Sequence, residues 1–299
     1  MNQQQSICSQ AREKPRAKRA ATQVFSFLTL RAAAFVNCAA LVIACVFLFV
    51  NGIGALNIDF VLDSPREMMT SGGVFPCLVG TFLLAAGAIA IALPFGVACA
   101  VWLNEYGKQG PVVDIVRLSV ANLAGVPSIV FGLFGLAFFV TALGFNVSLL
   151  SGILTLAVLT LPVIINTTEE ALKQVPRSWR DASLALGATK SQTIGRIVLP
   201  SALPGILTGA ILAVARAAGE TSAVMFTAAV FYTPKLPESV WSSVMALPYH
   251  MYVLATAGTE IEKTRPMQYG TGLLLVVLVF AMNLIAILIR DKMQKKRLA

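Results

Sequence analysis

The chain of 299 residues is apolar and basic: 57% of its residues are hydrophobic, only 12% are charged, and its formal net charge is +9 at pH 7. A soluble domain usually carries about twice that charged fraction, and the mean hydropathy of +0.78 argues against an ordinary soluble enzyme. The sequence holds no G-x-x-x-x-G-K-[ST] motif and no G-x-S-x-G motif, and its single histidine excludes a conventional zinc site. We therefore expect no catalytic residue, no metal site and no cofactor.

Six apolar runs are long enough to cross a membrane, because a helix needs roughly 20 apolar residues to span the hydrocarbon. They occupy residues 32–50, 74–102, 118–142, 149–166, 204–229 and 270–289. Continuous runs such as Phe82–Ala92 lack the alternation of barrel strands. The sequence therefore predicts an all-α integral membrane protein with six transmembrane helices.

The placement of lysine and arginine predicts the orientation of these spans. Four of these residues lie in loops on one side of the membrane: Arg66, Lys235, Lys263 and Arg265. Apart from Arg216, which lies within a span, the rest of the 23 lie on the other side, and the positive-inside rule makes that side cytoplasmic. We expect basic cytoplasmic tails at 1–31 and 291–299 around a six-helix domain at 32–290. The positive charge then reports topology rather than nucleic-acid binding.

The first apolar run follows a basic segment, as in a signal peptide. It is longer than a usual signal-peptide core and ends in Phe47-Leu-Phe-Val50, which lacks a small-x-small cleavage site. We expect an uncleaved first span.

Pro127 and Ser128 interrupt the third run near its start. A proline frees a backbone carbonyl and lets a membrane helix kink. Two interpretations stay open here, a gate and a simple packing kink.

The polar loop at 167–203 is too long to lack structure in a compact protein. Pro176 suits a helix start, Gly187 suits the position after a helix end, and Thr189-Lys-Ser-Gln192 has capping-box spacing. We expect two short helices joined at Gly187, the second limited by Pro200. Such an elbow would project into the cytoplasm and dock on another protein; the alternative is a loop folded back on its own bundle.

Arg216 and Glu220 are the charged residues that lie well inside a predicted span. An arginine near the centre of a membrane helix costs about 2.5–3.5 kcal/mol on insertion scales. Residues four apart share one helix face, so we expect the two side chains to form an ion pair.

Residues 239–257 are apolar enough to suggest a seventh span. Pro248, Tyr249 and His250 interrupt the segment, and a seventh span would place the basic C-terminus outside. We expect a short helix or re-entrant segment on the external face.

Four segments of this sequence resemble a known family. Asp181-Ala-Ser183, Gly187 and Ile197-Val-Leu199-Pro200 have the spacing of the EAA loop of ABC-importer permeases. The resemblance to phosphate-importer permeases of the PstA type rests on the other three: Pro127-Ser-Ile-Val-Phe-Gly-Leu-Phe-Gly135, Thr167-Thr-Glu-Glu170 and Ala213-Val-Ala-Arg216-Ala-Ala-Gly219-Glu220-Thr221. The resemblance as a whole spans residues 74–289.

This resemblance implies a MetI-like permease subunit of an ATP-driven phosphate importer in the bacterial cytoplasmic membrane. The docking residues for an ATPase would be Asp181, Ala182, Ser183, Gly187, Ile197, Leu199 and Pro200. The anion path would be lined by Pro127, Ser128, Arg216, Glu220 and Thr221. A guanidinium matches phosphate geometry, and a nearby carboxylate would keep the anion from binding too tightly.

The implied partners are a second, PstC-like permease, a PstB-like ATPase dimer, a PstS-like external phosphate-binding protein and the membrane lipid. No nucleic acid is expected. The runner-up functions are a permease for another oxyanion such as sulfate or molybdate, and an ATP-independent channel or secondary transporter. Internal inverted repeats, common in the last class, are not evident here.

Overall fold

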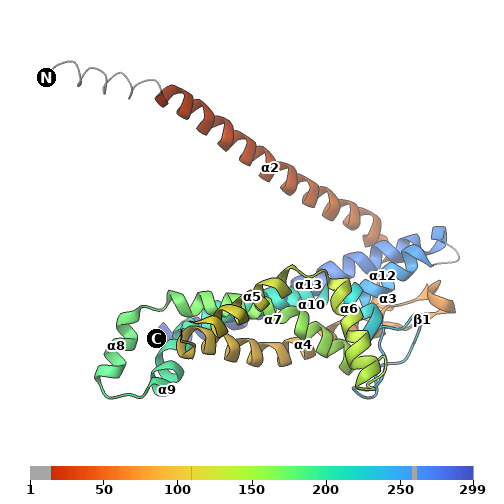
Figure 1. Cartoon of the computed structure of the whole chain (residues 1–299). Helices are drawn as coiled ribbons and strands as arrows, with labels where there is room; N and C mark the ends of the chain where they lie inside the picture. Colours follow the sequence, from red (N-terminus) through yellow and green to blue (C-terminus); the bar gives the residue numbers. More distant parts are fainter. Residues whose placement is uncertain (1–14, 109, 258–260, 299) are drawn as a thin grey trace. The chain divides into compact units, whose positions relative to one another are not determined.

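The computed structural model describes residues 15–108, 110–257 and 261–298, and helices dominate these ranges (Figure 1). The chain divides into two compact units, residues 1–51 and 52–299. The first contributes α2 (Pro15–Gly52), which contains the predicted first span. Apolar side chains such as Phe35 and Val42 are exposed on this helix, as suits a helix surrounded by lipid. Residues 1–14 of the predicted basic tail lie outside the described residues.

The second unit contains every remaining element. In chain order these are η1 (Ile53–Ala55), α3 (Ile58–Leu62), β1 (Pro65–Arg66), η2 (Glu67–Met69), β2 (Ser71–Gly72), α4 (Phe75–Val101), η3 (Trp102–Tyr106), α5 (Pro111–Gly125), α6 (Ser128–Gly135), η4 (Leu136–Ala142), α7 (Leu149–Gln174), α8 (Arg177–Ala185), α9 (Lys190–Thr193), η5 (Ile194–Val198), α10 (Leu199–Ala218), α11 (Ser222–Thr227), α12 (Leu247–Thr256) and α13 (Ile261–Leu298). The strands β1 and β2 form a small antiparallel pair.

The helices confirm an all-α membrane fold. Five are long and apolar enough to cross a membrane: Gln23–Ala55, Phe75–Tyr106, Leu149–Gln174, Lys190–Ala218 and Thr264–Met293. A sixth span is possible if the bent pair Pro111–Gly125 and Ser128–Ala142 counts as one. The spanning helices Leu149–Gln174 and Lys190–Ala218 both extend into the predicted loop at 167–203, so only residues 175–189 separate them.

The third predicted span is broken rather than kinked. Its two halves, α5 and α6–η4, meet at an angle of 104°. Val126 and Pro127 are both extended, with ψ of 131° and 141°. The proline removes a helix donor and pushes the residue before it out of the helical region, so the helix ends and starts again.

The fifth predicted span also differs, because it does not run as one helix to 229. It begins at Lys190, passes through the π-helical segment η5 and ends at Ala218. The second arm of the predicted elbow is therefore the start of a spanning helix and not a separate helix limited by Pro200. The change of hydrogen-bond register in η5 lies immediately before that proline, which lacks the N–H that a continuing helix would need.

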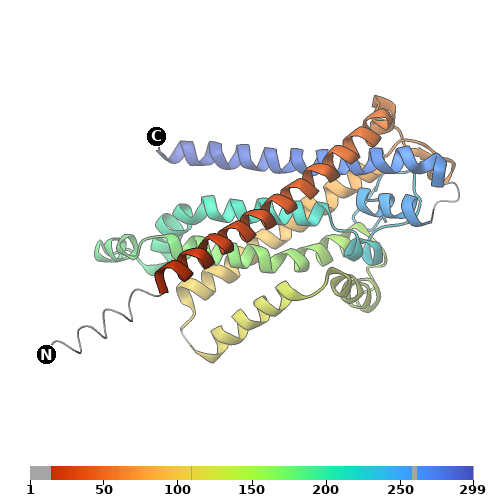
Figure 2. The ribbon, with the colours of Figure 1, turned by 90° about the horizontal axis from the view of Figure 1, so that it is seen from above.

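Helices α4, α7 and α10 form the centre of the second unit. Small residues allow them to approach closely, because Ala92, Ala157 and Ala213 pack around Ile164 in one cluster. Figures 1 and 2 both place α8, α9 and the C-terminal end of α13 at one end of this unit, and β1, α3 and α12 at the other. We call these the elbow end and the hairpin end.

The segment 239–257 forms no seventh span. It contains the ten-residue helix α12, which is too short to cross a bilayer. Leu247, His250 and Val253 are buried on its inner side. The expectation of a short helix is confirmed.

Candidate functional site

The breaks in the third and fifth predicted spans lie close together in the structure. Helix α6 packs on α11 through Gly132, where a Cβ atom would come within 2.8 Å of the Ser222 carbonyl oxygen and 3.0 Å of Ala223 Cα. Ser128 lies one turn before Gly132, and Thr221 directly precedes Ser222. The packing of two short helices therefore brings the Pro127–Ser128 break and the Gly219–Thr221 break to one region, which we call the break region.

Polar side chains in the break region lack partners within the described chain. Ser128, Arg216, Glu220 and Thr221 are all partly exposed, and none of these side chains forms a hydrogen bond or ion pair with another described residue. Pro127 is exposed beside them. This leaves donors and an acceptor free in an otherwise apolar bundle.

The predicted ion pair between Arg216 and Glu220 does not form. The helix ends at Ala218, so the two side chains do not share a helix face. Arg216 instead lies in the last turn of α10, and Glu220 lies two residues ahead of α11. Each charge is thus near the helix end whose dipole it complements, a cation at a C-terminus and an anion at an N-terminus.

The elbow, which comprises α8, the turn at Gly187 and α9 (residues 175–193), has the local turn structure that the sequence predicts. Helix α8 ends at Ala185, and Gly187, two residues further on, adopts a left-handed φ of +83°. The Gly187 and Ala188 N–H groups donate to the carbonyls of Leu184 and Ser183 at 3.0 and 3.2 Å, which is the Schellman arrangement. Thr189 and Gln192 then form a capping box at the start of α9. The local turn chemistry therefore makes the elbow a defined structure.

The outer surface of the elbow carries exposed apolar side chains although it lies beyond the spans. Trp179 and Leu184 are about half exposed, and Leu186 is 89% exposed. Asp181, Ala182 and Gly187 are exposed beside them. Apolar side chains gathered on a loop suggest a surface that another protein covers.

Other predicted docking residues lie deeper. The Ser183 hydroxyl is buried and within 2.9 Å of the Thr193 hydroxyl, so it joins the two arms of the elbow. Ile197 and Pro200 line a groove of about 920 Å³ between the end of α7, α8 and α10. Leu199 packs against the nearby apolar cluster. Some of the predicted docking residues are therefore exposed on the elbow surface, and the others lie beneath it and hold the elbow in place.

A buried ion pair attaches the elbow to the second span. Arg180 on α8 donates to Glu105 on η3, with Nη2 at 2.7 Å from Oε1. The same guanidinium donates to the carbonyls of Val175 and Leu172 at 2.7 and 3.0 Å. The guanidinium therefore caps the end of α7, where the Leu172 carbonyl also accepts from the Val175 N–H at 3.3 Å.

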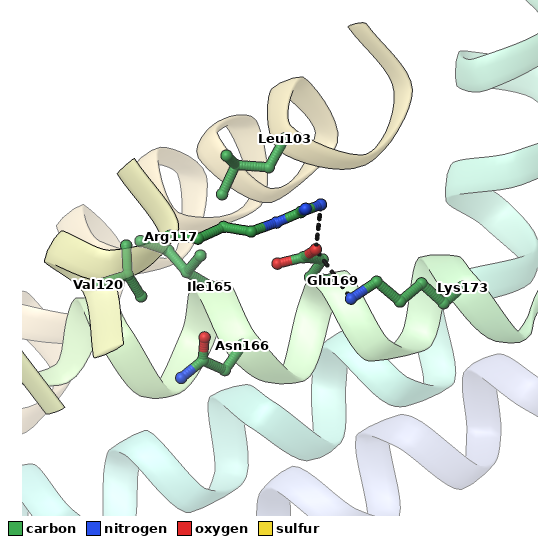
Figure 3. Close-up of a pocket in the computed structure, with 7 residues that line it drawn as sticks. All are labelled: Leu103, Arg117, Val120, Ile165, Asn166, Glu169 and Lys173. Carbon is green, nitrogen blue, oxygen red and sulfur yellow. Dashed lines mark hydrogen bonds and ion pairs between the residues drawn. The ribbon is translucent and has the colours of Figure 1, made fainter. Parts of the chain in front are cut away.

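A second charged cluster lies between α5 and α7 (Figure 3). Arg117 and Lys173 approach the same Glu169 oxygen, each at 2.9 Å. Glu169 is buried, whereas both cations are partly exposed. They line a pocket of about 230 Å³ with Leu103 and Asn166 among its other walls. Since Lys173 shares a helix with Glu169, the carboxylate keeps one partner even if α5 moves.

Sequence patterns did not single out Glu105, Arg180, Arg117 or Lys173, and Glu169 was noted only as part of the family-like segment Thr167-Thr-Glu-Glu170. The i, i+4 spacing of Glu169 and Lys173 could have predicted their ion pair, because residues four apart share one face of a helix. Nothing local could join Glu105 to Arg180, which are separated by 75 positions.

Comparisons with known proteins identify relatives over most of the chain. Residues 92–298 match the family described as "Binding-protein-dependent transport system inner membrane component". The chain is 39% identical over 228 residues to the "Phosphate transport system permease protein PstA 1" of Mycobacterium tuberculosis (strain CDC 1551 / Oshkosh), covering 76% of this chain and 73% of that protein. It is 33% identical over 266 residues to the "Probable ABC transporter permease protein YqgI" of Bacillus subtilis (strain 168), covering 83% and 90%.

Solved structures agree on the fold. A chain of a bacterial alginate ABC transporter, in complex with a pentasaccharide-bound periplasmic protein, superposes with a TM-score of 0.60 at 14% identity, covering 92% of this chain and 96% of that one. A chain of the inward-facing MetNI methionine ABC transporter gives 0.53 at 24% identity, covering 74% and 94%. At these identities the similarity concerns the fold alone.

Proposed function

Because this chain belongs to the family of binding-protein-dependent transport system inner membrane components, we propose that it is the permease subunit of an ATP-driven importer of inorganic phosphate. The carrying observation is the similarity to PstA proteins over about three quarters of the chain, with 39% identity to one of them. The function requires a membrane path, a polar site along it and a surface for an energy source. The bundle, the break region and the elbow are our candidates for these parts.

The break region is our candidate for the anion path. The Arg216 guanidinium has no partner among the described residues, and its parallel N–H donors suit a phosphate oxyanion. Ser128 and Thr221 add hydroxyl donors. Glu220 carries the opposite charge nearby and would weaken the hold on the anion, and a transporter must release its cargo to conduct it.

The elbow is our candidate for ATPase docking. Its exposed apolar residues and Asp181 would contact the ATPase, while Ser183 holds the two arms together. ATP binding would close the ATPase pair and displace the elbow, and the bundle would open alternately to each side. Hydrolysis then belongs to the partner, and this chain contributes no catalytic group.

The remaining partners follow from the same proposal. One bundle of up to six spans makes half of a path, so a second permease subunit completes it, and an external phosphate-binding protein delivers the cargo. The elbow and the end of α13 lie at the same end of the second unit (Figure 2). This supports an orientation in the bacterial cytoplasmic membrane in which the elbow and the C-terminal basic tail face the cytoplasm, and the positive-inside rule extends the proposal to the N-terminal tail.

Labelled-phosphate uptake in cells that lack this chain tests the function. Wild type should restore uptake, and excess sulfate or molybdate should not compete. Arg216→Gln should abolish uptake while the protein stays inserted and assembled, and Arg216→Lys should retain part of it, because charge remains without the guanidinium fork. Competition by sulfate or molybdate would indicate another oxyanion as the cargo, and normal uptake by Arg216→Gln would remove Arg216 from the path.

A further inference from the structure

The cytoplasmic end of the second span holds the elbow at two consecutive residues. Glu105 binds Arg180 of α8, and the ring of Tyr106 lies 5.1 Å from Lys190 Nζ of α9. Both residues belong to η3, the π-helical segment that continues α4. One short segment therefore contacts both arms of the elbow.

The Glu105–Arg180 contact is the stronger of the two. Their side chains are only 8% and 17% exposed. The Arg180 Nε atom also lies 3.3 Å from Glu105 Oε1, and Asn104 donates to that same oxygen at 2.8 Å. A buried, multiply bonded pair of this kind resists separation, because either partner alone would be left as an uncompensated charge.

The elbow behaves as one body on this attachment. The buried contact between the hydroxyls of Ser183 and Thr193 joins its two arms, and the guanidinium of Arg180 also holds the Leu172 and Val175 carbonyls. A displacement of α8 must therefore move η3 or break the buried pair.

Another residue of η3, Leu103, contacts α5, the first half of the broken third span. Leu103 packs in the same apolar cluster as Val113 of α5. Leu103 also lines the pocket that holds the Arg117–Glu169 ion pair between α5 and α7 (Figure 3). Helix α5 leads directly to the 104° bend and to Ser128. Movement of η3 thus has a packed route to the break region.

We propose that Glu105 and Arg180 are positioning residues that transmit displacement of the elbow to η3, and through Leu103 to α5 and the break region. The proposal rests on the proposed function, since it assigns how ATPase motion reaches the path. Glu105 lies beneath the elbow and not on its exposed surface, so its replacement separates transmission from docking.

The test uses the full importer reconstituted with its ATPase and binding protein in lipid vesicles. Phosphate uptake and ATP hydrolysis are measured in the same sample, giving the number of phosphates imported per ATP. Glu105→Gln should leave the ATPase bound and hydrolysing but lower this ratio by roughly tenfold, the range expected for loss of one strong coupling contact. Glu170→Gln, an exposed carboxylate on α7 at the same end, is the matched control and should keep the wild-type ratio.

Arg180→Lys guards against a variant that simply fails to fold. Lysine keeps a positive charge beside buried Glu105, but it cannot bond Glu105 and both carbonyls as the guanidinium fork does. We expect an assembled complex with an intermediate ratio. A wild-type ratio in an assembled Glu105→Gln complex would overturn the proposal and leave the pair a structural role. If Glu105→Gln does not assemble, a wild-type ratio in Arg180→Lys would do the same. Absence of phosphate uptake by the wild-type complex would instead refute the proposed function.

Discussion

Replacing Gly187 separates what a side chain does to the elbow from what it does to a docked partner. Gly187 has a φ of +83°, and a Cβ built on it meets no atom within 4 Å. Alanine would therefore meet no clash within the described chain. The substitution would destabilise the elbow only by the strain of an L-residue in the left-handed region, about 1–2 kcal/mol. Asparagine visits that region more readily, so Gly187→Asn adds a larger side chain at a lower backbone cost.

The two variants give different results under the two explanations. If Gly187 serves only to end α8, Gly187→Ala should reduce the ratio of formed to unformed elbows by about 5- to 30-fold, and Gly187→Asn should reduce it less. We expect instead that both variants lose uptake, with Gly187→Asn at least as impaired, because the docked ATPase leaves no room for a side chain. The assay is labelled-phosphate uptake, together with co-purification of the ATPase at matched membrane levels of the chain. Wild-type uptake and ATPase binding by Gly187→Asn would refute the docking argument.

Three further predictions concern the bundle. Glu169→Gln should remove the ion-pair partner of Arg117 and cost about 1–2 kcal/mol, a modest loss because the cations are partly exposed; faster amide exchange confined to α5 would confirm it, and unchanged exchange would count against it. Gly132→Ala should cost about 1–3 kcal/mol by forcing α6 away from α11 and should lower uptake, whereas Gly125→Ala, with no atom within 4 Å, should not; equal uptake by the two variants would contradict the packing argument. Burial lowers the pKa of His250 from 6.5 to about 4, so the fold holds it neutral while the unfolded chain protonates it. Stability is then fully present above pH 6.5 and falls by about 3 kcal/mol as the pH drops toward 4. His250→Leu should flatten the pH dependence of the unfolding midpoint over this range, and an unchanged slope would show that other groups cause it.

Hydropathy and local turn chemistry predicted much of this fold because both depend on short stretches of chain. Spans follow from the need to satisfy every backbone group in lipid. The end of α8 follows from the conformational freedom of Gly187, and the start of α9 from the Thr189–Gln192 box. These features require no knowledge of what packs against them.

The breaks and the ion pairs could not be predicted in the same way. Pro127 predicts an interruption of the helix. Whether the interruption is a slight kink or a 104° break depends on how the neighbouring helices pack, which the local sequence does not specify. Helix α10 ends at Ala218, and α11 packs on α6 a few residues further on, an arrangement that depends on the whole bundle. The same end of α10 separates Arg216 from Glu220, so helical spacing predicted an ion pair that the chain path prevents. Glu105 finds Arg180 only after the bundle has formed.

The break in the third segment also explains how a small displacement at the elbow end can matter at the path. Helix α5 spans 15 residues, about 22 Å at 1.5 Å per residue. Within α5, the buried residue is Val113. The ion pair between Arg117 of α5 and Glu169 of α7 is shared with Lys173, so α5 is held less firmly than α4 or α7. A straight, fully packed span would resist tilting along its whole length. A segment that ends at an extended Val126–Pro127 link can tilt as a lever while α6 stays packed on α11, and Ser128 follows the link directly. The arrangement therefore places a joint between two helices at the break region that we assign to the anion.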